Sequence, residues 1–202
     1  MKKLSLATFI GALAISVAGP MSAQDNRSFP QKFAVPFDTC KPERGVKFRG
    51  NKENALSSSE LSQRLVGNTL LSVDRYGTFA IYYPDATTSV GWMPKEKSKG
   101  YSWTVGRVDL SNNQYCRTWE QWKSGKYVNC WTAHVNGRLV DREALYFTCE
   151  NGVPDGDAHV ILPGNYLEIK YRGKGVRGGK LSQNDAKAAA VIDKYFGKYV
   201  NK

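Results

Sequence analysis

The feature that most constrains the fold is a cysteine-bearing hairpin within residues 101–131, a stretch that holds four of the five tryptophans. Residues 114–122 and 126–134 are typical of two β-strands, because both are rich in aromatic and β-branched residues and a short turn separates them. If Cys116 lies opposite Cys130, side-chain alternation puts the large rings on one face and the disulfide on the other. We expect the aromatic face to form the core and the cystine face to lie outside.

This register assigns a cross-strand partner to each residue of the hairpin. Glu120 then meets Lys126, an opposite-charge pair of the kind that supports a register. The pairs expected on the aromatic face are Tyr115 with Trp131, Arg117 with Asn129, and Trp119 with Tyr127.

Two interpretations of these rings remain open. They either fill the core, or some of them line a pocket for a small apolar or ring-shaped ligand. Arg117 is the one feature that favours a pocket, because a buried cation needs a partner and the hairpin supplies no evident acidic one. The candidate pocket residues are Trp103, Tyr115, Arg117, Trp119 and Trp131.

Residues 1–23 have the layout of a secretory signal peptide. Two lysines precede an apolar run at 4–18, and small residues with a helix-breaking Gly-Pro follow, so we expect cleavage before Gln24. A retained N-terminal anchor is the alternative, although the run is short for a membrane span. We therefore expect the mature protein to be exported, either to the periplasm or as a secreted protein.

The four cysteines form an even set in a chain that we expect to reach an oxidising compartment. Two disulfides are favoured over metal ligation, because the sequence holds no CxxC and no clustered Cys/His spacing. Three pairings are possible. The hairpin register favours Cys116–Cys130 and leaves Cys40–Cys149 to tie the N-terminal segment to the domain.

The segment before the hairpin divides into an arm, a helix and strands. Residues 24–57 hold scattered prolines without periodicity, and we expect an extended arm. Ser58 can cap a short helix in which Leu61 and Leu65 form the apolar stripe. Gly67 follows as a helix-ending residue.

From residue 69 onward, short strand patterns recur at roughly ten-residue spacing between turn signals. No alternation of strands and helices is present, so the pattern predicts a mainly β fold, an antiparallel meander that closes into a small barrel or forms a sandwich. We expect Asn136-Gly137 to be a turn, and the domain to span residues 58–165. The expected strands are 69–73, 78–83, 87–92, 101–105, the two hairpin strands, 143–149 and 158–162.

Residues 166–202 form a basic C-terminal extension. Within it, residues 170–202 carry nine Lys or Arg against Asp185 and Asp193, so most of the net charge of +11 lies there. We expect a helix at about 183–199 with one apolar and one basic stripe. Either it packs on the barrel wall, or its basic face engages anionic lipid, acidic polysaccharide or a protein. Candidate contacts for an anionic surface are Lys174, Arg177, Lys180, Lys187, Lys194 and Lys198.

The domain contains a set of spaced residues, namely Gly67-Asn68-Thr69, Gly100-x-x-Trp103-x-Val105, Cys116-x-x-Trp119, Cys130 and Pro163-Gly164-Asn165. Together they resemble a family of small secreted bacterial proteins that is known only as a domain of unknown function. The resemblance covers about residues 58–165 and implies a compact lipocalin-like (calycin-like) β-barrel behind a short helix. It implies no activity.

The chain contains no recognisable catalytic or metal-binding motif. The two histidines, His134 and His159, belong to no HExxH pattern, and no GxSxG surrounds a serine. The register puts His134 on the outer face, where we expect it to be exposed. Asp155-Gly156-Asp157 is more typical of a turn than of a calcium loop. We predict no catalytic residue, no metal and no cofactor.

The sequence therefore predicts an exported, non-enzymatic protein that binds a small apolar or aromatic ligand or an envelope component. The alternative is an envelope interaction protein whose basic C-terminal helix engages an anionic partner. Nucleic acid is a poor target for an exported protein despite the charge, and the sequence does not indicate an oligomeric state.

Overall fold

The computed structural model describes residues 51–74, 77–92, 103–119, 128–155 and 159–166, with the single residues 168, 190, 194 and 195. The predicted signal peptide and nearly all of the predicted arm lie outside these residues. No helix in the described ranges is long and apolar enough to cross a membrane. The elements are η2 (Lys52–Asn54), α1 (Ser58–Leu65), β1 (Thr69–Asp74), β2 (Gly77–Tyr82), β3 (Thr88–Trp92), β4 (Trp103–Asp109), β5 (Tyr115–Trp119), β6 (Asn129–Leu139), β7 (Arg142–Thr148) and β8 (His159–Leu162).

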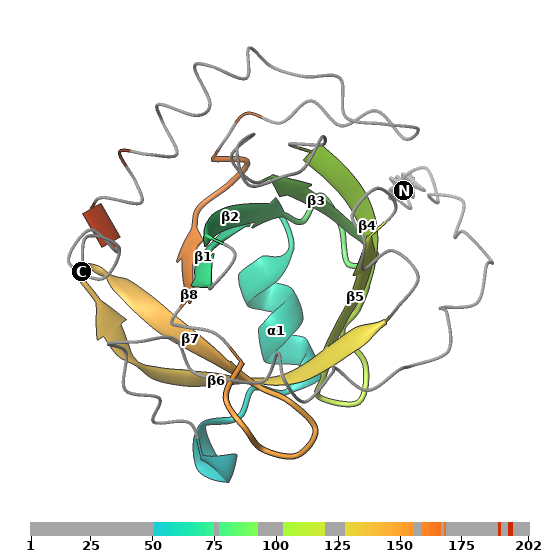
Figure 1. The fold of residues 1–202 in the computed structure, drawn as a ribbon, viewed down its shortest axis with the longest axis vertical. Helices are drawn as coiled ribbons and strands as arrows, with labels where there is room; N and C mark the ends of the chain where they lie inside the picture. The colour runs from blue at the N-terminus through green and yellow to red at the C-terminus, as the bar shows by residue number, and fades with distance from the viewer. Residues whose placement is uncertain are drawn as a thin grey trace, which may run out of the picture.

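The eight strands form one closed antiparallel barrel in which each strand pairs with its neighbours in sequence. The ring closes where β1 pairs with β8, with Thr69 opposite Leu162 and Ser72 opposite His159. Figure 1 shows the strands as a ring with α1 at its centre. The prediction of a mainly β fold is confirmed, and of its two forms the barrel is the correct one.

Side-chain alternation gives this barrel two apolar faces. Leu70 lies inside, while its neighbour Leu71 belongs to a separate cluster on the outer wall. The inner cluster includes Leu61, Leu65, Leu70, Phe79, Ile81, Tyr115, Trp119, Trp131, Leu145 and Phe147. The outer cluster contains Leu71, Ala80, Val90, Trp92, Val160, Leu162 and Tyr195.

Helix α1 packs its apolar stripe into the barrel, as Leu61 and Leu65 are both fully buried in the inner cluster. The N-cap, however, is Ser57 rather than Ser58. Ser57 Oγ accepts from the amide of Glu60, and the Glu60 carboxylate accepts from the amide of Ser57, a reciprocal capping box. Gly67 follows the helix with a positive φ of 76°, as expected for a helix-ending residue.

Ser58 has a different function from the expected cap. Its amide donates to Asn113 Oδ1 at 2.9 Å, and its hydroxyl accepts from the amide of Asn113 at 2.9 Å. These bonds fasten the start of α1 to the turn between β4 and β5. The helix is therefore fixed at one end of the barrel.

The central hairpin has the predicted register. Cys116 is opposite Cys130, and a disulfide joins them with an S–S distance of 2.04 Å. The pairs Tyr115–Trp131 and Arg117–Asn129 are also confirmed. The pairs expected for Trp119 and Glu120 involve residues 126 and 127, which lie outside the described residues.

Cys149 is also disulfide-bonded. It is buried in the inner cluster, away from the outward-facing pair. Cys40, the partner that we predict for it, lies outside the described residues.

The expected turn at Asn136-Gly137 is wrong. β6 continues through these residues to Leu139, and the turn to β7 is Val140-Asp141. The β6–β7 register shifts between Val135 and Arg138, and Gly137 has a positive φ of 68°. The glycine therefore supplies the backbone conformation of a β-bulge rather than that of a turn.

Part of the C-terminal extension contacts the outer wall. Tyr195 is buried in the outer cluster. Its hydroxyl donates to Asp141 Oδ1 at 2.8 Å, and Lys194 Nζ forms a 3.0 Å ion pair with Asp141 Oδ2. Of the expected helix at 183–199, only residues 190, 194 and 195 are described.

Candidate functional site

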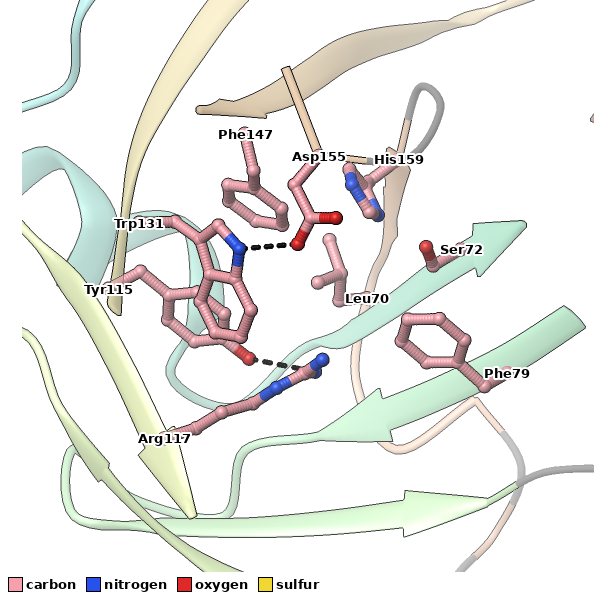
Figure 2. A pocket seen from close by; sticks show the side chains of 9 residues that line it. All are labelled: Leu70, Ser72, Phe79, Tyr115, Arg117, Trp131, Phe147, Asp155 and His159. Atoms are coloured by element: carbon pink, nitrogen blue, oxygen red, sulfur yellow. Dashed lines mark hydrogen bonds between the residues drawn. The ribbon is translucent and has the colours of Figure 1, made fainter. Parts of the chain in front are cut away.

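A cavity of about 40 Å³ lies inside the barrel. This volume is room for roughly three water molecules, so side chains fill most of the lumen. Figure 2 shows the lining side chains converging from different strands around one space. They are Leu70, Ser72, Phe79, Tyr115, Arg117, Trp131, Phe147, Asp155 and His159.

Arg117 places a guanidinium in this apolar lumen. Alternation along β5 puts it on the same face as Tyr115 and Trp119. Its Cζ lies 5.0 Å from the ring centre of Trp131, 5.1 Å from that of Trp119 and 5.5 Å from that of Phe79. Ring faces attract a cation, but they do not replace a carboxylate partner.

The polar contacts of Arg117 are few. Its Nη1 donates to Tyr115 Oη over a long 3.4 Å, and its Nε is buried without a hydrogen-bond partner. No described residue forms an ion pair with it. The carboxylate of Asp155 attracts the guanidinium but forms no ion pair with it. A desolvated cation without a close ion-pair partner is costly.

Tyr115 is held rigidly next to this cation. Its hydroxyl lies 2.6 Å from that of Tyr83, and its ring stacks on Trp131 and Phe147 at 5.7 and 5.2 Å. Burial, followed by the neighbouring Tyr115, raises the pKa of Tyr83 well above its usual value. Arg117 can only donate to Tyr115 Oη, whereas either hydroxyl of the Tyr115–Tyr83 pair can be the donor.

Ser72 and His159 form a second polar group of the cavity. They are direct partners across the β1–β8 ladder, so their side chains lie next to each other on the inner face. His159 is 4% exposed and Ser72 is 0% exposed. Ser72 Oγ and both ring nitrogens of His159 have no hydrogen-bond partner among the described residues.

His159 is neutral at physiological pH. Burial, together with the positive charge of Arg117, lowers the pKa of His159 to about 3. The imidazole packs against Phe147 with ring centres 4.4 Å apart. A neutral imidazole has one N–H donor and one acceptor nitrogen, and both are unused in this lumen.

Asp155 contributes a carboxylate to the same cavity. It follows β7, and its Oδ2 accepts from Trp131 Nε1 at 2.5 Å. This bond orients the indole ring next to Arg117, as Figure 2 shows. The cavity therefore contains one cation and one anion that form no ion pair with each other.

The structure brings together some of the residues predicted for a pocket. Tyr115, Arg117 and Trp131 line the cavity, and Trp119 contacts Arg117 from the side. Trp103 lies elsewhere, against Trp92 in the outer cluster with ring centres 6.3 Å apart. It does not line the cavity.

Sequence reasoning missed the other half of the cavity. Ser72 and His159 each sit at an inward position of an apolar strand, which was a readable signal, because a polar residue there needs a partner. Asp155 was interpreted only as part of a turn. No group of three metal-ligating side chains occurs among the described residues.

His134 is buried rather than exposed as we expected. Its outer-face position is correct, but residues 51–55 cross that face, and Ala55 bridges to His134. The ring nitrogens lie 2.9 Å from Asn51 O and 2.9 Å from Thr148 Oγ1. Covering by the N-terminal segment explains the burial and makes His134 a structural residue.

The basic surface predicted for the C-terminal extension is largely untested by the structure. Lys194 is engaged by Asp141, and hydrogen bonds from Lys194 and Tyr195 lower the pKa of Asp141 to about 2. The other candidates, Lys174, Arg177, Lys180, Lys187 and Lys198, lie outside the described residues.

Comparisons with family models, with curated proteins and with solved structures give no match. The fold is therefore described from this chain alone.

Proposed function

We propose that the protein binds a small ligand inside its barrel, at the cavity between Arg117 and His159. An eight-stranded barrel is just wide enough either to fill with side chains or to hold one small ligand. The volume of about 40 Å³ favours a small molecule, or one end of a longer molecule. The adjacent rings of Phe79, Trp131 and Phe147 suit an apolar or aromatic body.

One observation carries this proposal: three polar side chains converge on the cavity with buried atoms that no described residue satisfies. These are Arg117 Nε, Ser72 Oγ and the two nitrogens of His159. Most buried polar atoms in proteins have partners, so a cluster of unsatisfied atoms around a cavity supports the presence of a further molecule. Ordered water alone is the competing explanation.

We also propose that the binding takes place outside the cytoplasm. The signal-like residues 1–23 and the resemblance to small secreted bacterial proteins support this location. The Cys116–Cys130 disulfide is compatible with an oxidising compartment.

A cavity-filling variant tests the proposal. The purified protein is mixed with fractionated envelope extract, and bound molecules are recovered and identified by mass spectrometry. Ser72→Leu should abolish recovery, because the added side chain occupies the cavity. Val140→Leu, at an exposed turn position (59% exposed), is the matched control. Equal recovery by both variants would contradict an internal site.

The basic extension supports a second candidate, in which it engages anionic lipid or acidic polysaccharide. The concentration of charge in residues 170–202 favours this candidate, whereas the Lys194–Asp141 pair removes one lysine from such a surface. Replacing Lys174, Arg177 and Lys180 by Glu should reduce retention on heparin and on anionic vesicles at low salt. Unchanged retention would remove this candidate.

A further inference from the structure

The donor chemistry of the cavity narrows the class of ligand, if the internal site of the proposed function is correct. Arg117 Nε and Ser72 Oγ each offer a hydrogen, and neutral His159 offers one from a ring nitrogen. None of these atoms has a hydrogen-bond partner. Three unused donors around one space select a group that is rich in acceptor oxygens.

Charge indicates which acceptor group fits. Among the described residues Arg117 is the one cation that lines the cavity, and it forms no ion pair with any of them. The carboxylate of Asp155 lines the same space and would repel an anion of higher charge, such as a phosphate dianion. A single negative charge spread over two oxygens matches a guanidinium best.

The surroundings indicate what the group is attached to. The rings of Phe79, Trp131 and Phe147 border the donors, and they offer apolar surface rather than further hydrogen bonds. The cavity itself has room for little more than a carboxylate and its nearest carbon atoms.

We propose that the cavity is a carboxylate site, in which Arg117, Ser72 and His159 bind the acid group of a small monocarboxylic acid with an apolar or aromatic body. The acid supplies a close ion-pair partner for Arg117, which forms no ion pair with a described residue. Ser72 and His159, adjacent across the β1–β8 ladder, donate to the oxygens on the other side.

Matched acid and amide probes test the class directly on the full-length protein. Propionate and benzoate are compared with propionamide and benzamide, and with inorganic phosphate, by titration of the indole N–H signals of isotope-labelled protein in NMR spectra. The signal of the Trp131 N–H reports on the site, because this group donates a hydrogen bond to Asp155 and both residues line the cavity. The dissociation constant of each acid should be at least about tenfold lower than that of its amide, because the acid forms a charge-assisted hydrogen bond where the amide forms a neutral one. Phosphate should bind more weakly than either acid.

Two variants test which residues cause the preference for the acid over the amide. Arg117→Met should remove the difference in affinity between benzoate and benzamide. Ser72→Ala should weaken the binding of benzoate while the fold is kept. Arg138→Met removes one exposed positive charge away from the cavity and should leave binding unchanged.

The same titration distinguishes a failure of the carboxylate site from a failure of the proposed function. Equal binding of acids and amides, or tighter binding of phosphate, overturns the carboxylate site and leaves an internal binding site in place. No shift with any probe up to its solubility limit overturns both the carboxylate site and the proposed function.

Discussion

Arg117 on β5 and Trp131 on the adjacent strand β6 lie side by side on the inner face of the barrel, with the guanidinium carbon 5.0 Å from the ring centre of the indole. A hydrogen bond to Asp155 orients the Trp131 ring beside a guanidinium that forms no ion pair with any described residue, although the Asp155 carboxylate attracts it. The polar part of the lumen is therefore also the part in which buried polar atoms lack hydrogen-bond partners among the described residues. Stability and binding are therefore expected to oppose each other at Arg117.

We predict that Arg117→Met stabilises the empty protein. Burying a guanidinium that forms no ion pair costs several kcal/mol of folding free energy. The contacts with the aromatic rings offset only about 0.5–2 kcal/mol of this cost. We expect the free energy of unfolding to rise by about 1 kcal/mol or more in chemical denaturation. Arg138→Met, at an exposed position, is the control with the same change of charge. A clear loss of stability specific to Arg117→Met would show that the cation is satisfied in the folded protein.

We predict that His159 makes the protein acid-sensitive. Its pKa is lowered in the folded state, to about 3, so between that value and the ordinary value near 6.5 the unfolded chain binds a proton that the folded chain does not. Stability should therefore fall as the pH drops through this window, by about 2 kcal/mol between pH 7 and pH 5. His159→Leu should flatten the profile in urea denaturation. An unchanged slope in that variant would assign the acid sensitivity to other groups.

We predict that the Cys116–Cys130 disulfide contributes substantially to stability. The two residues are 14 apart in sequence, and closing a loop of this length restricts the unfolded chain by about 3 kcal/mol. The double variant Cys116→Ala, Cys130→Ala should lose about this free energy of unfolding while the bond at Cys149 is kept. A loss below about 1 kcal/mol would contradict the prediction, because it would mean that the crosslink hardly restricts the unfolded chain.

We predict that Gly106→Ala disrupts the barrel. A Cβ at this position would overlap the carbonyl oxygen of Thr118 and lie 2.6 Å from Trp119 Cε3 and 2.8 Å from Ser89 Oγ. The backbone of β5 cannot yield easily, so we expect a loss of about 2 kcal/mol or more. Gly152→Ala is the control, since open space surrounds that glycine and only its positive φ is strained. Equal effects of the two variants in thermal melts would contradict the steric argument.

We predict that Asp141 fastens the C-terminal extension to the barrel. Asp141→Asn removes the ion pair with Lys194 and weakens the bond from Tyr195, so limited proteolysis should cut the extension faster. Because Lys194 and Tyr195 lower the pKa of Asp141 to about 2, the attachment should be complete above the usual aspartate range and weaken only as the pH falls toward that value. Asp85→Asn, at an exposed position between β2 and β3, serves as control.

Local patterns were sufficient to predict the strands and the central register. The Cys116–Cys130 pairing follows from contacts between residues that are close in sequence, so alternation and a single covalent constraint determine the face of Tyr115 and Arg117. The helix cap was misplaced by one residue, although Glu60 stands three residues after Ser57 in the S-x-x-E spacing of a capping box and so indicates Ser57 rather than Ser58.

The rest of the cavity depends on barrel closure. Ser72 and His159 meet only because β1 pairs with β8, and no local pattern specifies which distant strands become neighbours. Gly137 shows a similar ambiguity. A positive φ suits a turn and a bulge equally well, and the pairing of Leu139 with Arg142 across the true turn decides between them.

The ladders between neighbouring strands of the barrel differ in length. β6 and β7 share a long ladder, whereas in the described residues β7 and β8 are paired only at Ala144–Val160 and Leu145–His159. Thermal breathing should begin where the fewest backbone bonds must break. Among the described residues this is the shortest of the ladders, and it ends at His159, so the strand pair that is expected to open first lies beside the cavity.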